Sequence, residues 1–219
     1  MPEIDLMRSY PKTDRTNMLN MREAVTSQDR LIAKKFGREY FDGPRRLGLG
    51  GYYYHPKYFT GVVKDFIEHY KLKENAKILD IGCGKGFMMK DFKDALPNAE
   101  VHGIDISRYC YENAMQEVKE NIKIGSCDDL PFEDNAFDLV ISIATIHNLD
   151  KAGVKKSLRE IMRVGNKHHF IKINGYRTSL ERDNLERWNL VANTILPVKE
   201  WEELFKEVNY TGDYSFFST

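Results

Sequence analysis

The stretch that decides the fold is Lys77-Ile78-Leu79-Asp80-Ile81-Gly82-Cys83-Gly84-Lys85-Gly86. An apolar run of strand length leads directly into a glycine cluster, and a helical pattern follows near residues 86–95. A strand that enters a helix through glycines lets a nucleotide approach the backbone at the helix N-terminus. Glycine turns also occur without a ligand, so this stretch alone favours a nucleotide site no more than a plain turn.

Two aspartates beside the glycine cluster favour the nucleotide site. Asp80 lies near the end of the strand, where a carboxylate is costly to bury unless a cationic or donating group meets it. Asp105 ends a second apolar run about 20 residues after the glycines, where a carboxylate accepts both hydroxyls of a ribose. The alternative role for Asp105 is to cap the next helix, a position that Ser107 can also fill. The pair therefore predicts a nucleoside-type cofactor.

Strands and helices alternate after residue 77. Apolar runs predict strands near residues 77–81, 100–105, 121–125, 137–143 and 168–174, and helical patterns lie near 86–95, 107–119 and 151–163. Such alternation is typical of a parallel sheet built from right-handed βαβ units. We therefore predict an α/β fold that is doubly wound and Rossmann-like, with a mostly parallel sheet.

The last part of the chain holds one more predicted strand. Helical patterns cover residues 180–195 and 198–208, and residues 210–217 favour a strand. A hairpin needs two such runs and a turn, so we predict six strands, five parallel and the terminal one antiparallel. We expect the edge left open to be covered by a partner subunit, in a homodimer, or by the N-terminal segment.

Residues 1–56 are expected to form a helical and aromatic cap on a Rossmann-like domain of residues 57–219. A helical pattern covers residues 21–36, and a second covers 57–70. Between them lies Gly50-Gly51-Tyr52-Tyr53-Tyr54-His55, which is too apolar to be left in water. We therefore expect the segment from about residue 20 to the end of the cap to fold over the carboxyl edge of the sheet and enclose the substrate.

The composition is that of an ordinary globular protein. The chain has 219 residues, 42% of them hydrophobic, and its 33 lysines and arginines balance 33 aspartates and glutamates. This balance disfavours nucleic acid as a partner, because binding to phosphates needs a basic surplus. The charged N-terminus and the lack of any apolar run of about 20 residues favour a cytoplasmic protein away from membranes. The three cysteines have no metal-ligand spacing, so we expect no metal.

The region from residue 77 to about 165 resembles class I S-adenosylmethionine-dependent methyltransferases of the small-molecule, type 11-like kind. Residues 79–86 resemble the first motif of that family, residues 103–107 the second, and residues 129–140 the third and fourth. The resemblance implies S-adenosylmethionine as cofactor. It also implies methyl transfer to an O or N atom of a small-molecule acceptor, whose identity the motifs leave open.

The resemblance implies a cofactor site around the glycine loop. The loop backbone would face the methionine part, with Asp80 near its amino group, and Asp105 would bind the ribose. Ser126 or Asp128 would accept from the adenine amine, while Ile106 and Ile143 would flank the cofactor unless they are simply core residues. The residues expected at the cofactor are Asp80, Gly82, Cys83, Gly84, Gly86, Asp105, Ile106, Ser126, Cys127, Asp128 and Ile143.

Catalytic candidates follow from what methyl transfer needs. The enzyme must align a nucleophile with the methyl carbon and exclude water, and it needs a base only if the acceptor loses a proton. His147, after the fourth strand, is the candidate base, and its alternative is a structural role in the loop. Tyr53 and Tyr54 are candidates for an aromatic lid, and their alternative is to pack the cap onto the core.

Four further residues are candidates for the acceptor site. They are Tyr52 and His55 in the aromatic loop and Tyr176 and Arg177 after the fifth strand. Arg177 would suit an anionic group on the acceptor, although a solvated arginine is the commoner case. Two alternatives to a methyltransferase remain, an NAD-type dehydrogenase and a non-catalytic scaffold that binds the cofactor. Cofactor binding distinguishes the enzymes, and the intact glycine loop argues against the scaffold.

Overall fold

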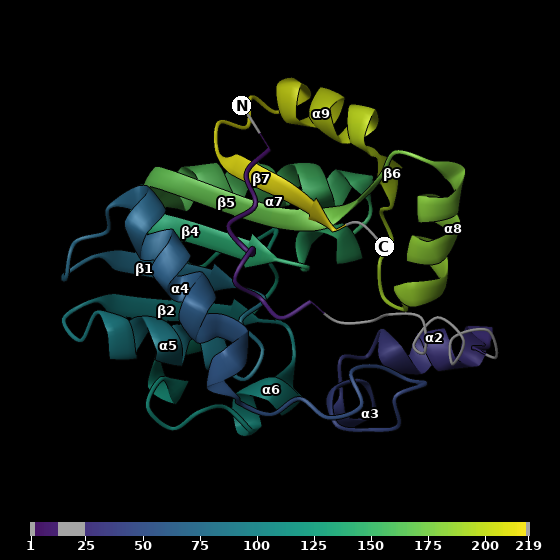
Figure 1. The fold of residues 1–219 in the computed structure, drawn as a ribbon, viewed down its shortest axis with the longest axis horizontal. Helices are drawn as coiled ribbons and strands as arrows, with labels where there is room; N and C mark the ends of the chain where they lie inside the picture. The colour runs from purple at the N-terminus through teal and green to yellow at the C-terminus, as the bar shows by residue number, and fades with distance from the viewer. Residues whose placement is uncertain (1–2, 13–24, 218–219) are drawn as a thin grey trace.

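A computed structural model describes residues 3–12 and 25–217 of the chain. Within them, seven strands form one sheet in which β3, β2, β1, β4, β5 and β6 are successive neighbours and β7 pairs with β5 (Figure 1). Every pairing between strands is parallel. The strands are β1 Lys77–Ile81, β2 Glu100–Asp105, β3 Ile122–Ile124, β4 Phe137–Ile143, β5 Gly165–Tyr176, β6 Leu196–Pro197 and β7 Asp213–Phe217.

Helices cover both faces of this sheet, which confirms the doubly wound α/β fold. One apolar core includes Phe66 and Phe92 of α4 and α5, and the other includes Leu158 and Trp201 of α7 and α9. Each core forms because one apolar stripe of a helix meets one face of the sheet. The helices are α2 Ser27–Ala33, α3 Arg38–Phe41, α4 Pro56–Tyr70, α5 Phe87–Ala95, α6 Arg108–Glu112, α7 Lys151–Val164, α8 Ser179–Trp188 and α9 Val198–Glu207.

The predicted end of the sheet is wrong in both the number and the direction of its strands. The chain adds a two-residue strand, β6, so the sheet has seven strands where six were predicted. The terminal strand, β7, is parallel to β5 and not antiparallel. The reason is α9, which lies between β6 and β7 and carries the chain back across the sheet, so that β7 enters in the same direction.

The helix predicted over residues 180–195 is also too long, because α8 ends at Trp188. The Asn189 side chain accepts hydrogen bonds from the backbone N–H groups of Val191 and Ala192, 2.9 and 2.8 Å away. A turn closed by an asparagine side chain competes with the helix and ends it. Residues beyond this turn are then free to form β6.

The outer edge of β7 is covered by an N-terminal strap, residues 3–10. Glu3 forms a parallel bridge with Tyr214, and the Ile4 N–H donates to the Tyr214 carbonyl at 2.9 Å. The strap is fixed to α4 through Asp65, which accepts from Arg8 at 2.6 Å and from Ser9 at 2.5 Å. The N-terminal segment therefore covers this part of the edge, one of the two coverings that the sequence led us to expect.

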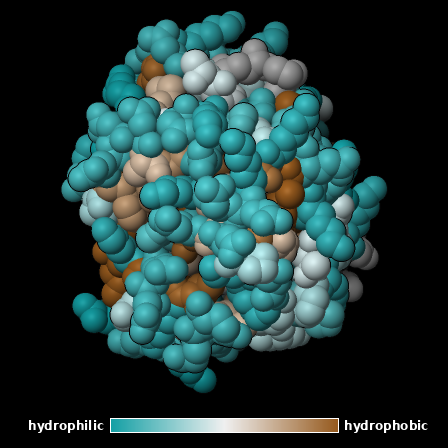
Figure 2. Space-filling model, turned by 90° about the vertical axis from the view of Figure 1, so that its left-hand side faces the viewer, coloured by the Kyte–Doolittle hydropathy of each residue, from teal (hydrophilic) through white to brown (hydrophobic). Residues whose placement is uncertain are grey.

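Residues 25–56 lie at the carboxyl edge of the sheet, at the lower right of Figure 1. The helix predicted over residues 21–36 is observed as the shorter α2, and the part of it before residue 25 lies outside the described residues. Ser107, just after β2, donates to the Phe36 carbonyl at 2.6 Å and ties this segment to the sheet. The opposite end of the molecule, where the strands begin, has a mostly hydrophilic surface with separate apolar spots (Figure 2).

Residues 3–12 and 25–217 contain neither a membrane-spanning helix nor a cluster of side chains that suits a metal ion. No helix there has the length and apolar character required to cross a membrane. Nor do three or more histidine, cysteine, aspartate or glutamate side chains gather there in a group that suits a metal ion.

Candidate functional site

The glycine loop between β1 and α5 adopts a backbone that favours glycine at three positions. Gly82, Gly84 and Gly86 have φ angles of +78°, +56° and +78°, in the left-handed region. A Cβ on Gly82 would lie 1.9 Å from the Thr145 hydroxyl oxygen. The loop therefore needs glycine both for its conformation and for its close packing against the segment after β4.

Asp105 lies at the end of β2 and accepts a hydrogen bond from the backbone of the glycine loop. One carboxylate oxygen accepts from the Gly84 N–H at 2.8 Å, and the other accepts from the Ser107 N–H at 2.8 Å. The cap of α6 is Ser107, whose hydroxyl accepts from the Cys110 N–H, so Asp105 is not needed there. Burial raises the pKa of the Asp105 carboxyl. Each oxygen keeps a second lone pair that can accept from a ligand hydroxyl.

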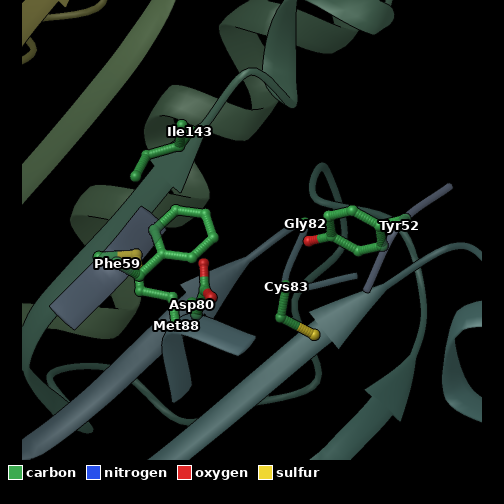
Figure 3. A pocket seen from close by; sticks show the side chains of 7 residues that line it. All are labelled: Tyr52, Phe59, Asp80, Gly82, Cys83, Met88 and Ile143. Atoms are coloured by element: carbon green, nitrogen blue, oxygen red, sulfur yellow. The ribbon is translucent and has the colours of Figure 1, made fainter. Parts of the chain in front are cut away.

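Asp80 lies one strand away and has a different environment. It is 5% exposed, and no hydrogen-bond donor among the described residues contacts its carboxylate. Burial, and secondly the charge of Asp105, raises the pKa of Asp80 to about 7. The carboxylate points into a cavity of about 80 Å³ beside the Phe59 ring (Figure 3). A buried carboxylate in such a position suits a cationic partner.

Two adjoining cavities meet at the glycine loop. The smaller contains Asp80, and the larger, about 250 Å³, contains Asp105. Tyr52, Gly82 and Ile143 line both. The smaller is also lined by Phe59, Cys83 and Met88, and the larger by Phe36, Tyr40, Phe41, Leu49, Gly84, Ile104, Ile106, Gly125, Ser126, Cys127, Ala144, Thr145, Asn148 and Leu149.

Nine of the eleven residues expected at the cofactor line one of these cavities. Ile106 is 58% exposed at the wall of the larger cavity, a position that core packing does not explain. Ser126 also lines it and donates a short hydrogen bond to Asp128, which leaves the serine oxygen able to accept. Asp128 and Gly86 line neither cavity. Gly86 instead packs closely, because a Cβ there would lie 2.7 Å from Val118.

His147 lies outside both cavities, in a short 3₁₀ turn after β4. It is 1% exposed, its Nδ1 accepts from the Asn174 N–H at 3.3 Å, and its Nε2 lies 3.3 Å from the Asn189 amide nitrogen. Burial lowers the pKa of His147 to about 3, so the ring is neutral. This placement favours the structural role over the role of general base.

The tyrosine run divides into three different environments. The Tyr52 ring packs on Phe87 with centroids 4.6 Å apart, and its hydroxyl points toward the space between Gly82 and Asp80 (Figure 3). Tyr53 is 69% exposed and lines neither cavity. Tyr54 donates to Asp91 of α5 at 2.5 Å, away from both cavities. The structure thus brings Tyr52 to the site and leaves the two catalytic candidates outside it.

The other expected acceptor contacts also lie elsewhere. His55 caps α4 by accepting from the Lys57 N–H at 3.1 Å. Tyr176 ends β5 and pairs with Pro197. Arg177 forms an ion pair of 2.6 Å with Glu3 of the N-terminal strap. None of the three lines either cavity.

The sequence reasoning missed the polar contacts that hold residues 25–56 against the glycine loop. Lys85 donates to the Asp42 carboxylate at 2.6 Å and to the Tyr52 carbonyl at 2.7 Å. Asp42 also accepts from the Tyr109 hydroxyl at 2.5 Å and from the Tyr52 N–H at 2.7 Å. We call this group, Asp42, Tyr52, Lys85 and Tyr109, the latch. The sequence indicates these contacts only through Asp42, a charged residue that directly follows the aromatic pair Tyr40 and Phe41.

The donor and acceptor groups fit S-adenosylmethionine. Asp80, with no protein partner among the described residues, suits the cationic amino group of the methionine part. Asp105 has lone pairs that suit ribose hydroxyls, and the exposed Ile106 side chain would suit the apolar face of an adenine ring. The structure thus brings Asp80, Asp105 and Ile106 to the two adjoining cavities, and the part of the cofactor that each contacts stays a prediction.

Comparisons with known proteins agree with this fit. A family model described as a methyltransferase domain matches residues 78–168. The chain is 33% identical over 134 residues to the sterol 4-C-methyltransferase of Caenorhabditis elegans, covering 55% of this chain and 38% of that protein. It is 30% identical over 109 residues to the demethylmenaquinone methyltransferase of Symbiobacterium thermophilum, covering 46% and 43%. The chain thus spans less than half the length of these curated relatives.

A solved structure has the same fold. The YcgJ protein of Bacillus subtilis superposes with a TM-score of 0.54 at 22% identity, over 67% of this chain and 66% of that one. At this identity the likeness concerns the fold alone.

Proposed function

Because the chain belongs to the class I S-adenosylmethionine-dependent methyltransferase family, we propose that it transfers a methyl group to an O or N atom of a small-molecule acceptor. The observation that carries the proposal is the pair of aspartates on either side of the glycine loop. Asp80 and Asp105 face adjoining cavities, and each has the charge and burial that one polar part of the cofactor requires. A nicotinamide dinucleotide has no cationic amino group to meet Asp80.

Methyl transfer requires the protein mainly to hold the acceptor in line with the methyl group. When bound, S-adenosylmethionine would supply an electrophilic methyl group to a lone pair of the acceptor. The chain's own residues hold the reactants and exclude solvent. Phe36, Tyr40 and Phe41 form an aromatic wall of the larger cavity, and the latch keeps that wall against the glycine loop. A dry apolar site suits a reaction that disperses charge.

The cavity dimensions and the charge of the chain support a small acceptor. A cavity of about 250 Å³ must hold part of the cofactor as well, which leaves room for a small metabolite. The formal net charge of zero gives no general attraction for nucleic acid. A cytoplasmic location is part of the same proposal.

Calorimetry tests the proposed function directly. S-Adenosylhomocysteine, the demethylated product, should bind in the micromolar range, about −8 kcal/mol, and NADH should not bind. Transfer of labelled methyl groups to a panel of small metabolites then identifies the acceptor. Tight NADH binding without binding of the sulfur cofactor would overturn the proposal in favour of a dehydrogenase.

A further inference from the structure

Tyr52 lies where the two adjoining cavities meet. Of the described residues that line them, Tyr52, Gly82 and Ile143 line both. Glycine has no side chain and the isoleucine side chain is a hydrocarbon, so the hydroxyl of Tyr52 is the one polar side-chain group that these shared residues bring to the junction. Figure 3 shows this hydroxyl directed toward the space between Gly82 and Asp80.

Several contacts hold the Tyr52 side chain in this place. Its ring packs on Phe87 with centroids 4.6 Å apart. Its backbone N–H donates to Asp42 at 2.7 Å, and its carbonyl accepts from Lys85 at 2.7 Å. A Cβ on Gly84 would lie 2.8 Å from the hydroxyl oxygen, so the hydroxyl lies directly against the glycine loop. The ring and the backbone fix the position of Tyr52, and the hydroxyl is not needed for it.

The Tyr52 hydroxyl has no hydrogen-bond partner among the described residues, whereas the hydroxyl of Tyr54 donates to Asp91 at 2.5 Å. Burial, and then the charges of neighbouring acidic groups that include Asp80 and Asp105, hold the pKa of Tyr52 well above its usual value. The hydroxyl is therefore neutral near pH 7. A neutral hydroxyl without a fixed partner is free to turn its oxygen lone pairs toward a cation.

The covalent structure of S-adenosylmethionine brings its sulfur to the same junction. In the proposed function, Asp80 in the smaller cavity meets the amino group of the methionine part, and Asp105 in the larger cavity meets the ribose. The sulfur joins these two parts and lies midway along the chain of atoms between them. A ligand with one part in each cavity therefore has its sulfur beside the residues that line both. This sulfur is positively charged in S-adenosylmethionine and neutral in S-adenosylhomocysteine.

We propose that the Tyr52 hydroxyl faces the sulfur of the bound cofactor and favours the charged S-adenosylmethionine over its neutral product. This inference rests on the proposed function and adds to it a residue that distinguishes the two forms of the cofactor. An oxygen lone pair is attracted by a positive sulfur and gains little from a neutral one, so the product is held less tightly at this contact. The sequence suggested Tyr52 as a contact of the acceptor, and this proposal assigns its hydroxyl to the cofactor instead.

Calorimetry with both forms of the cofactor on Tyr52→Phe tests this role. Phenylalanine keeps the ring and removes the hydroxyl alone. The affinity for S-adenosylmethionine should fall by about 3–10-fold, and the affinity for S-adenosylhomocysteine by less than about 2-fold, so the ratio of the two affinities should change. Because the hydroxyl has no partner among the described residues, the Tm without ligand should equal that of the wild-type protein.

The adjacent tyrosines and the other side chain at the junction provide matched controls. Tyr53→Phe removes the hydroxyl of an exposed tyrosine and should leave both affinities and the Tm unchanged. Tyr54→Phe removes the hydrogen bond to Asp91, so it should lower the Tm and leave the affinity ratio unchanged. Ile143→Val shortens an apolar side chain at the junction, so it should change both affinities by the same factor.

Three results for Tyr52→Phe would overturn the inference. Equal losses of affinity for the two ligands would assign the hydroxyl to a part of the cofactor that both share. Unchanged affinities for both would return Tyr52 to the acceptor. A variant that does not fold, or that has a lower Tm and an unchanged affinity ratio, would make the role of the hydroxyl structural.

The wild-type protein separates this inference from the proposed function. If it binds neither S-adenosylmethionine nor S-adenosylhomocysteine, the proposed function fails and the role of Tyr52 fails with it. If it binds both and Tyr52→Phe leaves the affinity ratio unchanged, the proposed function stands and the role of Tyr52 alone is wrong.

Discussion

The Lys85 ammonium lies 2.6 Å from the Asp42 carboxylate, and this contact joins the glycine loop to residues 25–56. Both side chains are largely withdrawn from solvent, and Asp42 accepts three hydrogen bonds in all. Although burial opposes it, bonding from Lys85 and Tyr109 holds the pKa of Asp42 below its usual value. The ion pair therefore joins the glycine loop, which would bind the methionine part of the cofactor, to the segment that carries the aromatic wall of the larger cavity.

The latch predicts the effect of Lys85→Met. The substitution leaves Asp42 with a partly buried charge and frees the Tyr52 carbonyl, so we expect a loss of about 1–3 kcal/mol in the free energy of unfolding. Limited proteolysis should show faster cleavage within residues 36–52. Lys90→Met is the matched control, because Lys90 pairs with an exposed aspartate on its own helix. Equal losses of unfolding free energy in the two variants would show that the latch stabilises the fold no more than a surface ion pair does.

Asp105→Ala tests the ribose contact. Removing both carboxylate oxygens should weaken binding of S-adenosylhomocysteine by about 1–3 kcal/mol, measured by calorimetry on variants with a native circular dichroism spectrum. Asp129→Ala is the control, because Asp129 is exposed and lines neither cavity, so this change should alter the affinity by less than about 0.5 kcal/mol. An unchanged affinity in Asp105→Ala would remove this residue from the site.

The raised pKa of Asp80 predicts a pH dependence of stability. With a folded pKa of about 7 against 3.8 in the unfolded chain, the native state binds the extra proton between these values. Stability is then fully present below the unfolded pKa and falls as pH rises toward 7, by up to about 4 kcal/mol. Urea unfolding at pH 5–8 should show this slope in the wild-type protein without cofactor and not in Asp80→Asn. The same slope in both proteins would contradict the assignment.

Cofactor binding should reverse the protonation of Asp80. A cationic amino group beside the carboxylate favours its ionised form, so binding at pH 6 to 7 should release a proton. Calorimetric titration of S-adenosylhomocysteine in two buffers with different ionisation enthalpies measures that proton. Proton release that is equally large in Asp80→Asn would assign it to another group.

His147 predicts the opposite slope. Its folded pKa of about 3 lies below the 6.5 of the unfolded chain, so the unfolded state binds more protons in this range. Stability from this residue is present above pH 6.5 and is lost as pH falls toward 3. Thermal unfolding between pH 4 and 7 should show a weaker acid dependence in His147→Asn. A pH–rate profile for methyl transfer that loses its limb near 6.5 in that variant would restore the role of general base.

The glycine loop and the first five strands are predictable from the sequence because their signals are local. Residues 77–81, 100–105 and 137–143 are strands in both prediction and structure, since short apolar runs between glycine-rich or polar turns allow little else. The direction of β7 depends on where α9 packs, which periodicity does not encode. The alternation of side chains along a strand is the same in a parallel and in an antiparallel pairing, so it does not predict the direction of β7 relative to β5.

The cofactor residues and the catalytic candidates differ in predictability for a related reason. Asp80 and Asp105 are tied to motif positions next to the loop, whereas the environment of His147 is made by Asn174 and Asn189, distant in the sequence. The ion pair of Lys85 with Asp42 also joins segments that are distant in the sequence. The sequence around a single lysine or aspartate does not indicate which residue it will pair with. The tyrosine run shows the same limit, because adjacent tyrosines have three unrelated surroundings.

The bridge between Glu3 and Tyr214 has a consequence for the order of events during synthesis. Glu3 leaves the ribosome well before its partner strand β7, because nearly all of the described chain lies between them. Contacts of such long sequence separation form late and slowly in folding. Until then the strap and the open edge of β5 are both exposed to other strands in the cell, so this protein should depend on chaperones chiefly until β7 has been synthesised.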